Sequence, residues 1–173
     1  MDLFEAIRGR RSVRRYLPDP VPEGDLRRIL EAAVWAPSAG NLQSWEFVVV
    51  RDPARKEALA RAAYGQGFVA QAPLVVVVCA DRAKSASEYG RRGWELYSIQ
   101  DAAAATQNML LAAHALGYGS CWVGAFDEGE VSRILGLPPR VRPLAIVPIG
   151  RPAEEPEPPP RLPLERVTHQ EEF

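Results

Sequence analysis

LVVVVCAD, residues 74–81, is an apolar run of strand length that ends at an aspartate. WEFVVVRD, residues 45–52, has the same character. β-Branched residues favour extended backbone, and a strand that is apolar on both faces must be covered on both faces. We therefore predict that these two segments are central strands of a sheet with a layer of structure on each side.

Amphipathic patterns and short apolar runs predict the remaining elements. Helices are expected near residues 3–7 and at 23–35, 54–63, 98–116 and 127–135, and further strands at 120–126 and 141–150. The helix at 98–116 is the longest, and its alanine stripe allows close packing against another helix. Pro143 and Pro148 cannot donate to a strand ladder, so the last strand is expected at a sheet edge or bounded by them.

Composition favours one soluble domain. The chain has 173 residues, is 47% hydrophobic and carries a formal net charge of −1, so no global field attracts nucleic acid or a membrane surface. No secretory leader or membrane-spanning run is evident, and we expect a cytoplasmic protein. Cys79 and Cys121 lack CxxC spacing and are interpreted as buried thiols.

RGRRSVRRY, residues 8–16, contains five arginines, so any anion site of this chain should be local to this segment. A solvated face or a disordered arm is the simpler interpretation of such a block. The functional interpretation is that Arg10, Arg11 and Ser12 surround one phosphate, because a guanidinium matches two phosphate oxygens at once. Arg14 would then face a second anionic group.

PSAGNLQ, residues 37–43, is a second polar segment. Asn41 and Gln43 carry amides that both donate and accept, which suits the edge of a flat heteroaromatic ligand. The alternative is that proline, serine, glycine and asparagine here simply form a turn.

Motifs for other chemistries are missing. The chain has no GxSxG, HExxH, Walker A or GxGxxG sequence and no histidine–cysteine cluster with metal-ligand spacing. His114 is interpreted as a packed or partly exposed helix residue. We therefore expect a bound cofactor to carry any redox chemistry.

The C-terminal segment is rich in proline: six of the twelve residues 152–163 are prolines. This composition favours an extended arm, and a disordered tail is one interpretation. Leu162, Leu164 and Val167 favour another, in which the arm lies over a surface such as that of a partner subunit.

Several motifs occur in a fixed order from Arg8 to Val167: RRSVR, PSAGNLQSW, APLVVVV, GYGSCWVGAF and RLPL. Together they resemble the FMN-dependent nitroreductase family. The resemblance implies an α+β fold with a central mixed, largely antiparallel sheet flanked by helices. It also implies one domain over residues 1–173, with 152–173 as an extended arm, and an intertwined homodimer with two FMN sites at the interface.

The resemblance also assigns site residues. Arg10, Arg11 and Ser12 would hold the phosphate and ribityl chain, and Arg14 would lie near the pyrimidine edge of the flavin. The loop that the partner subunit places over the flavin would consist of Pro37, Ser38, Ala39, Asn41 and Gln43. The Gln66 amide and the backbone of Val123, Gly124 and Ala125 would lie by the ring, and Arg161 of the arm would be a second phosphate ligand.

The implied activity is a ping-pong oxidoreductase reaction in which NADH or NADPH reduces FMN, which then reduces a nitroaromatic, quinone or similar small acceptor. No catalytic side chain is required, and Arg14 would tune the flavin. The chain is shorter than many members and has QSW where QPW is frequent. Alternatives are a flavin-binding protein without turnover, a dehalogenating or flavin-modifying member, and an anion or nucleic-acid binding module.

Overall fold

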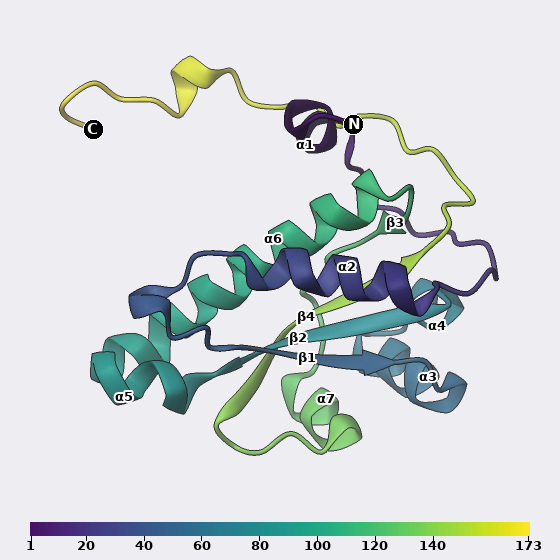
Figure 1. The fold of residues 1–173 in the computed structure, drawn as a ribbon, viewed down its shortest axis with the longest axis horizontal. Helices are drawn as coiled ribbons and strands as arrows, with labels where there is room; N and C mark the ends of the chain where they lie inside the picture. Colours follow the sequence, from purple (N-terminus) through teal and green to yellow (C-terminus); the bar gives the residue numbers. More distant parts are fainter.

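The structure is a computed structural model that describes residues 1–173. It is an α+β fold built on one four-stranded antiparallel sheet with the order β1-β2-β4-β3 (Figure 1). The strands are β1 (Trp45–Val50), β2 (Leu74–Asp81), β3 (Gly119–Ser120) and β4 (Val141–Gly150). All eight residues of β2 are buried, which confirms the central strand predicted at 74–81. The prediction that 45–52 is also central is wrong, because β1 lies at the edge of the sheet and only its first and last residues are buried.

Helices cover both faces of the sheet (Figure 1). They are α1 (Leu3–Gly9), α2 (Glu23–Val34), α3 (Pro53–Ala62), α4 (Phe68–Gln71), α5 (Arg82–Arg92), α6 (Ser98–Ala115) and α7 (Glu128–Leu135). Side chains alternate between the two faces of β2. Val76 and Val78 pack with α2 and α6, whereas Val75 and Val77 pack with α3, α4 and α7, so each face has its own apolar core.

Local sequence explains where helices begin and end. Asp2 caps α1 by accepting from the backbone N–H groups of Phe4 and Glu5, and Glu5 accepts from the Asp2 N–H. Asp127 caps α7, which ends at Gly136 with a left-handed φ of 65°. These caps agree with the helices expected from the sequence.

The strand predicted at 120–126 is wrong in its extent. The strand β3 covers only Gly119–Ser120, and beyond it only Val123 forms an isolated bridge, with Ile146. α4, α5 and the π-helical turn η2 (Gly93–Tyr97) were not predicted. The α5 sequence RAKSASEYGRR is mostly polar, and its apolar face consists only of small alanines and one tyrosine, which is a weak signal for a helix.

The predicted place of the last strand is also wrong, because β4 lies between β2 and β3 with both prolines inside it. Two local features of the sheet allow prolines, which lack an N–H donor, inside this strand. Pro143 follows a register shift between Val78 and Cys79 of β2. The N–H of Ile146 points away from β2 to bond Val123, and strand alternation places the Pro148 nitrogen on that same, sparsely paired side.

Both cysteines are buried free thiols, as predicted. Burial raises the pKa of Cys79 to about 12. No helix combines the length and the apolar character that crossing a bilayer requires.

Beyond Gly150 the chain is extended apart from one short turn, η3 (Leu164–Arg166). In Figure 1 this yellow segment passes α1 and leaves the body of the molecule. Leu162, Leu164 and Val167 are 66%, 71% and 57% exposed. Any surface that they cover therefore does not belong to the same chain.

Candidate functional site

The arginine-rich segment lies along the short edge strand β3. Ser12 forms a parallel bridge with Ser120, and the Val13 N–H donates to the Ser120 carbonyl at 2.9 Å. Glycine is required at position 119, because a Cβ there would lie 2.8 Å from the Val13 Cβ. The segment is thus ordered against the sheet, which rules out the interpretation as a disordered arm.

A pocket of about 850 Å³ opens beside this segment, between α1, the end of α6 and the start of the C-terminal arm. Arg10, Arg11, His114 and Ser120 are among its lining residues. The Ser120 hydroxyl is buried and has no hydrogen-bond partner in the chain. Such a buried polar atom is expected to bind something, so the pocket suits an oxygen-rich anionic group.

Positive charge at the pocket is not neutralised by ion pairs. Arg10 and Arg11 form no ion pair, and Arg11 Nη1 donates instead to the carbonyls of Arg8 and Arg10 at 2.6 and 3.0 Å. Burial, together with the charges of Arg10 and Arg11, lowers the pKa of His114. His114 is therefore favoured as the neutral imidazole, and the positive charge beside it comes from Arg10 and Arg11.

Carboxylates from the arm face the same pocket, although no sequence pattern predicted them. Glu154, Glu155 and Glu157 line it, and Glu154 Oε1 accepts the Arg14 N–H at 2.6 Å. They fall in a proline-rich stretch whose composition says nothing about its contacts. An anion that binds here must compete with this negative charge.

The Tyr16 and Cys121 side chains, two groups near Arg14, are uncharged. The Tyr16 hydroxyl donates to the Val13 carbonyl at 2.5 Å, and burial raises the pKa of Tyr16. Burial also raises the pKa of Cys121, against smaller lowering by Arg14 and Ser12. Both groups stay protonated at neutral pH, so they add no negative charge.

Arg14, Gln66 and Ala125 lie around one neighbouring part of the surface. Gln66 Nε2 donates to the Ala125 carbonyl at 3.1 Å, and Arg14 Cζ lies 5.9 Å from the centre of the Phe68 ring. Gly124 and Ala125 are exposed, but Val123 is buried and both its backbone groups bond Ile146. Of the segment 123–125, the last two residues are thus the ones open to a ligand.

The loop at 37–43 is a tight turn that includes η1 (Ala39–Asn41). Ser38 Oγ accepts the Gln43 N–H at 3.0 Å, and Gln43 Nε2 donates to the Asn41 carbonyl at 3.3 Å. Asn41 and Gln43 have left-handed φ values of 55° and 53°. Pro37 comes directly before this turn. The hydrogen bonds and the φ values show that the backbone forms a turn, as the alternative interpretation expected.

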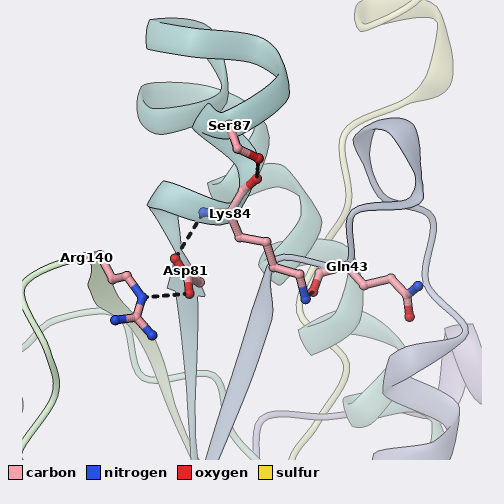
Figure 2. Close-up of polar contacts among 5 residues, drawn as sticks. All are labelled: Gln43, Asp81, Lys84, Ser87 and Arg140. Carbon is pink, nitrogen blue, oxygen red and sulfur yellow. Dashed lines mark hydrogen bonds and ion pairs between the residues drawn. The ribbon is translucent and has the colours of Figure 1, made fainter.

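The loop is also hydrogen-bonded to the first turn of α5, the helix that follows β2 (Figure 2). Lys84 Nζ donates to the Gln43 carbonyl at 3.1 Å, and Ser87 Oγ donates to the Lys84 carbonyl at 2.7 Å. Asp81 accepts from the Lys84 N–H at 3.1 Å and from Arg140 Nε at 3.0 Å. Tertiary contacts therefore set the position of the turn.

The expected site residues form two separate groups within the chain. Asp101, near the start of α6, bonds the 37–43 loop, whereas His114, near its end, lines the arginine pocket. Thirteen helical residues at 1.5 Å each separate them by about 20 Å. Arg161 joins neither group, since its hydrogen bond goes to the neighbouring Pro160 carbonyl at 3.4 Å.

The chain is thus an α+β protein with an antiparallel sheet, a polar pocket lined by arginines and glutamates at its short edge strand, and a polar turn near the start of its longest helix. The nitroreductase family model matches residues 7–70 and 60–151. The chain belongs to the nitroreductase family, and this confirms the resemblance found in its motifs.

Relatives match over nearly the whole chain. A protein of Thermus thermophilus named NADH dehydrogenase is 44% identical, and the match covers 96% of this chain and 95% of that protein. The FMN reductase [NAD(P)H] of Bacillus subtilis is 36% identical, over 99% of this chain and 74% of its own length. The solved NADPH:FMN oxidoreductase of Vibrio harveyi, complexed with NAD+, superposes with a TM-score of 0.91 at 29% identity, over 98% of this chain and 77% of that one.

Proposed function

We propose that this chain is an FMN-dependent oxidoreductase that takes a hydride from NADH or NADPH and reduces a nitroaromatic, quinone or similar small acceptor in a ping-pong cycle. The observation that carries the proposal is the pocket beside β3 in which Arg10 and Arg11 form no ion pair. Family membership and relatives named as flavin reductases support it. Bound FMN would supply the redox chemistry.

The residues of the pocket fit a terminal phosphate. Arg10 and Arg11 offer guanidinium donors that no carboxylate of the chain occupies. Ser12 lies beside them, and the orphan hydroxyl of Ser120 gives the pocket a further neutral donor. Charge-assisted hydrogen bonds of this kind fix both the position and the orientation of a phosphate.

We further propose that the protein works in the cytoplasm as a homodimer of one-domain chains, with residues 152–173 as an arm over the partner. Leu3, Phe4 and Ile7 of α1 are exposed, and Trp35 is 86% exposed beside the 37–43 loop. Apolar surface of this kind favours association. A second copy would bring its loop, and Arg161 of its arm, to the pocket, and so would unite the two separated groups.

The purified protein is expected to be yellow, and anaerobic addition of NADH or NADPH should bleach its visible spectrum. The faster of the two nicotinamides identifies the donor. A yellow protein that neither donor bleaches would instead be a flavin-binding protein without turnover. A colourless protein that does not take up FMN would contradict the proposal, above all if it bound RNA with a steep dependence on salt.

Arg14→Gln is expected to lower the midpoint potential of the bound flavin. A cation near the pyrimidine edge stabilises the anionic reduced form more than the oxidised form, so removing it favours oxidation. Arg15→Gln is the matched control, because it removes the same charge from an exposed neighbour in the chain. A spectroelectrochemical titration measures both variants, and an unchanged potential in Arg14→Gln would remove this role.

A further inference from the structure

Asp101 of α6 is a buried carboxylate that makes no ion pair. It is 4% exposed, and both of its oxygens accept hydrogen bonds from the segment that follows α2. Burying an ionised carboxylate is unfavourable unless its hydrogen bonds compensate. The position lies among alanines, and an apolar residue would serve the helix as well. This residue therefore calls for an explanation other than helix stability.

Its two oxygens hold the two ends of one loop. Oδ1 accepts the Ala39 N–H at 3.0 Å, and Oδ2 accepts the Ser44 hydroxyl at 2.7 Å. Ser44 is fully buried, and its carbonyl accepts the Asp81 N–H at 2.7 Å. One side chain from α6 thus closes the loop across residues 39–44.

The backbone between these two points is unfavourable by itself. Gly40, Asn41 and Gln43 all have left-handed φ values, between 53° and 56°, which side-chain-bearing residues seldom adopt. Tyr89 also crowds Gly40, since a Cβ at that glycine would lie 2.5 Å from the Tyr89 hydroxyl. A loop under such constraints keeps its shape only if the surrounding structure holds it.

We propose that Asp101 is the positioning residue of the 37–43 loop. Its two hydrogen bonds, to the Ala39 N–H and the Ser44 hydroxyl, form a grip on the loop that presents the Asn41 and Gln43 amides in the geometry that binds the flavin. The flavin part of this inference rests on the proposed function. The grip itself does not, because it is a property of the chain without a ligand. Preorganising the loop before binding removes the cost of ordering it during binding.

Lys84 provides the contrast. It also bonds the loop, at the Gln43 carbonyl, but it is an exposed side chain at the surface (Figure 2). Exposed charged contacts contribute little to holding a structure. Lys84→Ala is therefore a matched control that removes a loop contact without opening the buried grip.

The test compares full-length wild-type protein with Asp101→Ala, Asp101→Asn, Ser44→Ala and the Lys84→Ala control. Hydrogen–deuterium exchange of the flavin-free chain follows the amides of residues 39–43, with β2 as internal reference. In Asp101→Ala we expect exchange in the loop to accelerate at least about tenfold while β2 stays protected. Asp101→Asn keeps an acceptor for the Ala39 N–H, so the loop should recover part of its protection from exchange. Ser44→Ala should lose part of that protection. Lys84→Ala should show the same loop exchange as the wild-type protein.

FMN titration of the same proteins is the second measurement, and the dissociation constant of Asp101→Ala should rise about tenfold. Unchanged loop exchange in Asp101→Ala, or equal acceleration of the loop and β2, would overturn the positioning role. Faster loop exchange with unchanged FMN affinity would overturn the flavin part of the inference. If wild-type protein failed to bind FMN, the proposed function would fall while the exchange result still decided the grip. If Asp101→Ala does not fold, Asp101→Asn and Ser44→Ala decide by the same criteria.

Discussion

The double variant Arg10→Ala/Arg11→Ala should bind FMN at least about 100-fold more weakly than the wild-type protein. A hydrogen bond to a charged group contributes about 1.5–3 kcal/mol, and the variant removes two such donors from one pocket. Each 1.4 kcal/mol corresponds to a factor of ten in affinity. The loss should be strong because neither arginine forms an ion pair in the free protein, although the carboxylates of Glu154, Glu155 and Glu157 line the same pocket.

The matched control is Arg8→Ala/Arg15→Ala, which removes the same charge from the same segment at two positions that do not line the pocket. Fluorescence titration with FMN at one fixed ionic strength measures all three proteins. The control should lose affinity only a few-fold, through the general field of the segment. Equal losses in the two double variants would mean that the pocket has no specific phosphate site.

Leu59→Ala should lower the free energy of unfolding by about 2–5 kcal/mol. Leu59 lies on α3, is fully buried, and packs in the core that α3, α4 and α7 form against the sheet. The substitution removes apolar contacts and leaves a cavity in a close-packed layer. The loss is large compared with the 5–15 kcal/mol that typically stabilises a domain.

Glu57→Ala on the same helix is the control, because Glu57 is exposed and its ion pair with Arg61, at 3.7 Å, is also exposed. Such a surface change should stay within about 0.5 kcal/mol. Urea unfolding followed by circular dichroism measures both variants. A Leu59→Ala midpoint equal to that of Glu57→Ala would show that this layer is not a close-packed core.

Much of the fold could be predicted because its signals are local. The apolar run at 74–81 and the stripe at 98–116 were sufficient to locate β2 and α6, since burial of a strand on two faces leaves a continuous apolar run and burial of a helix on one face leaves a periodic stripe. α5 left only a weak signal, because its sequence is mostly polar. The prediction from the prolines of β4 was wrong because a strand can contain proline where the proline nitrogen faces a sparsely paired side. The sequence does not show which side of the strand is paired.

The candidate site could be predicted only in part. The arginine segment and the 37–43 turn were both recognisable from residue types. Their separation along α6, the carboxylates of the arm beside Arg14, and the orphan hydroxyl of Ser120 were not. Asp101 gave no signal at all, because an aspartate in a helix is ordinarily a solvent-exposed residue.

The sequence by itself determined the residue types of the site, the positions of the main helices and of the strands β1 and β2, and the family, but not that β1 lies at the edge of the sheet. The tertiary structure alone decided which of those residues meet: Ser12 beside Ser120, Arg14 against Glu154, and Asp101 across the ends of a loop some sixty positions earlier. The physical reason is that strand and helix patterns are set by neighbours in the chain. Hydrogen bonds between distant segments are set by how the layers pack, and no local period records that packing.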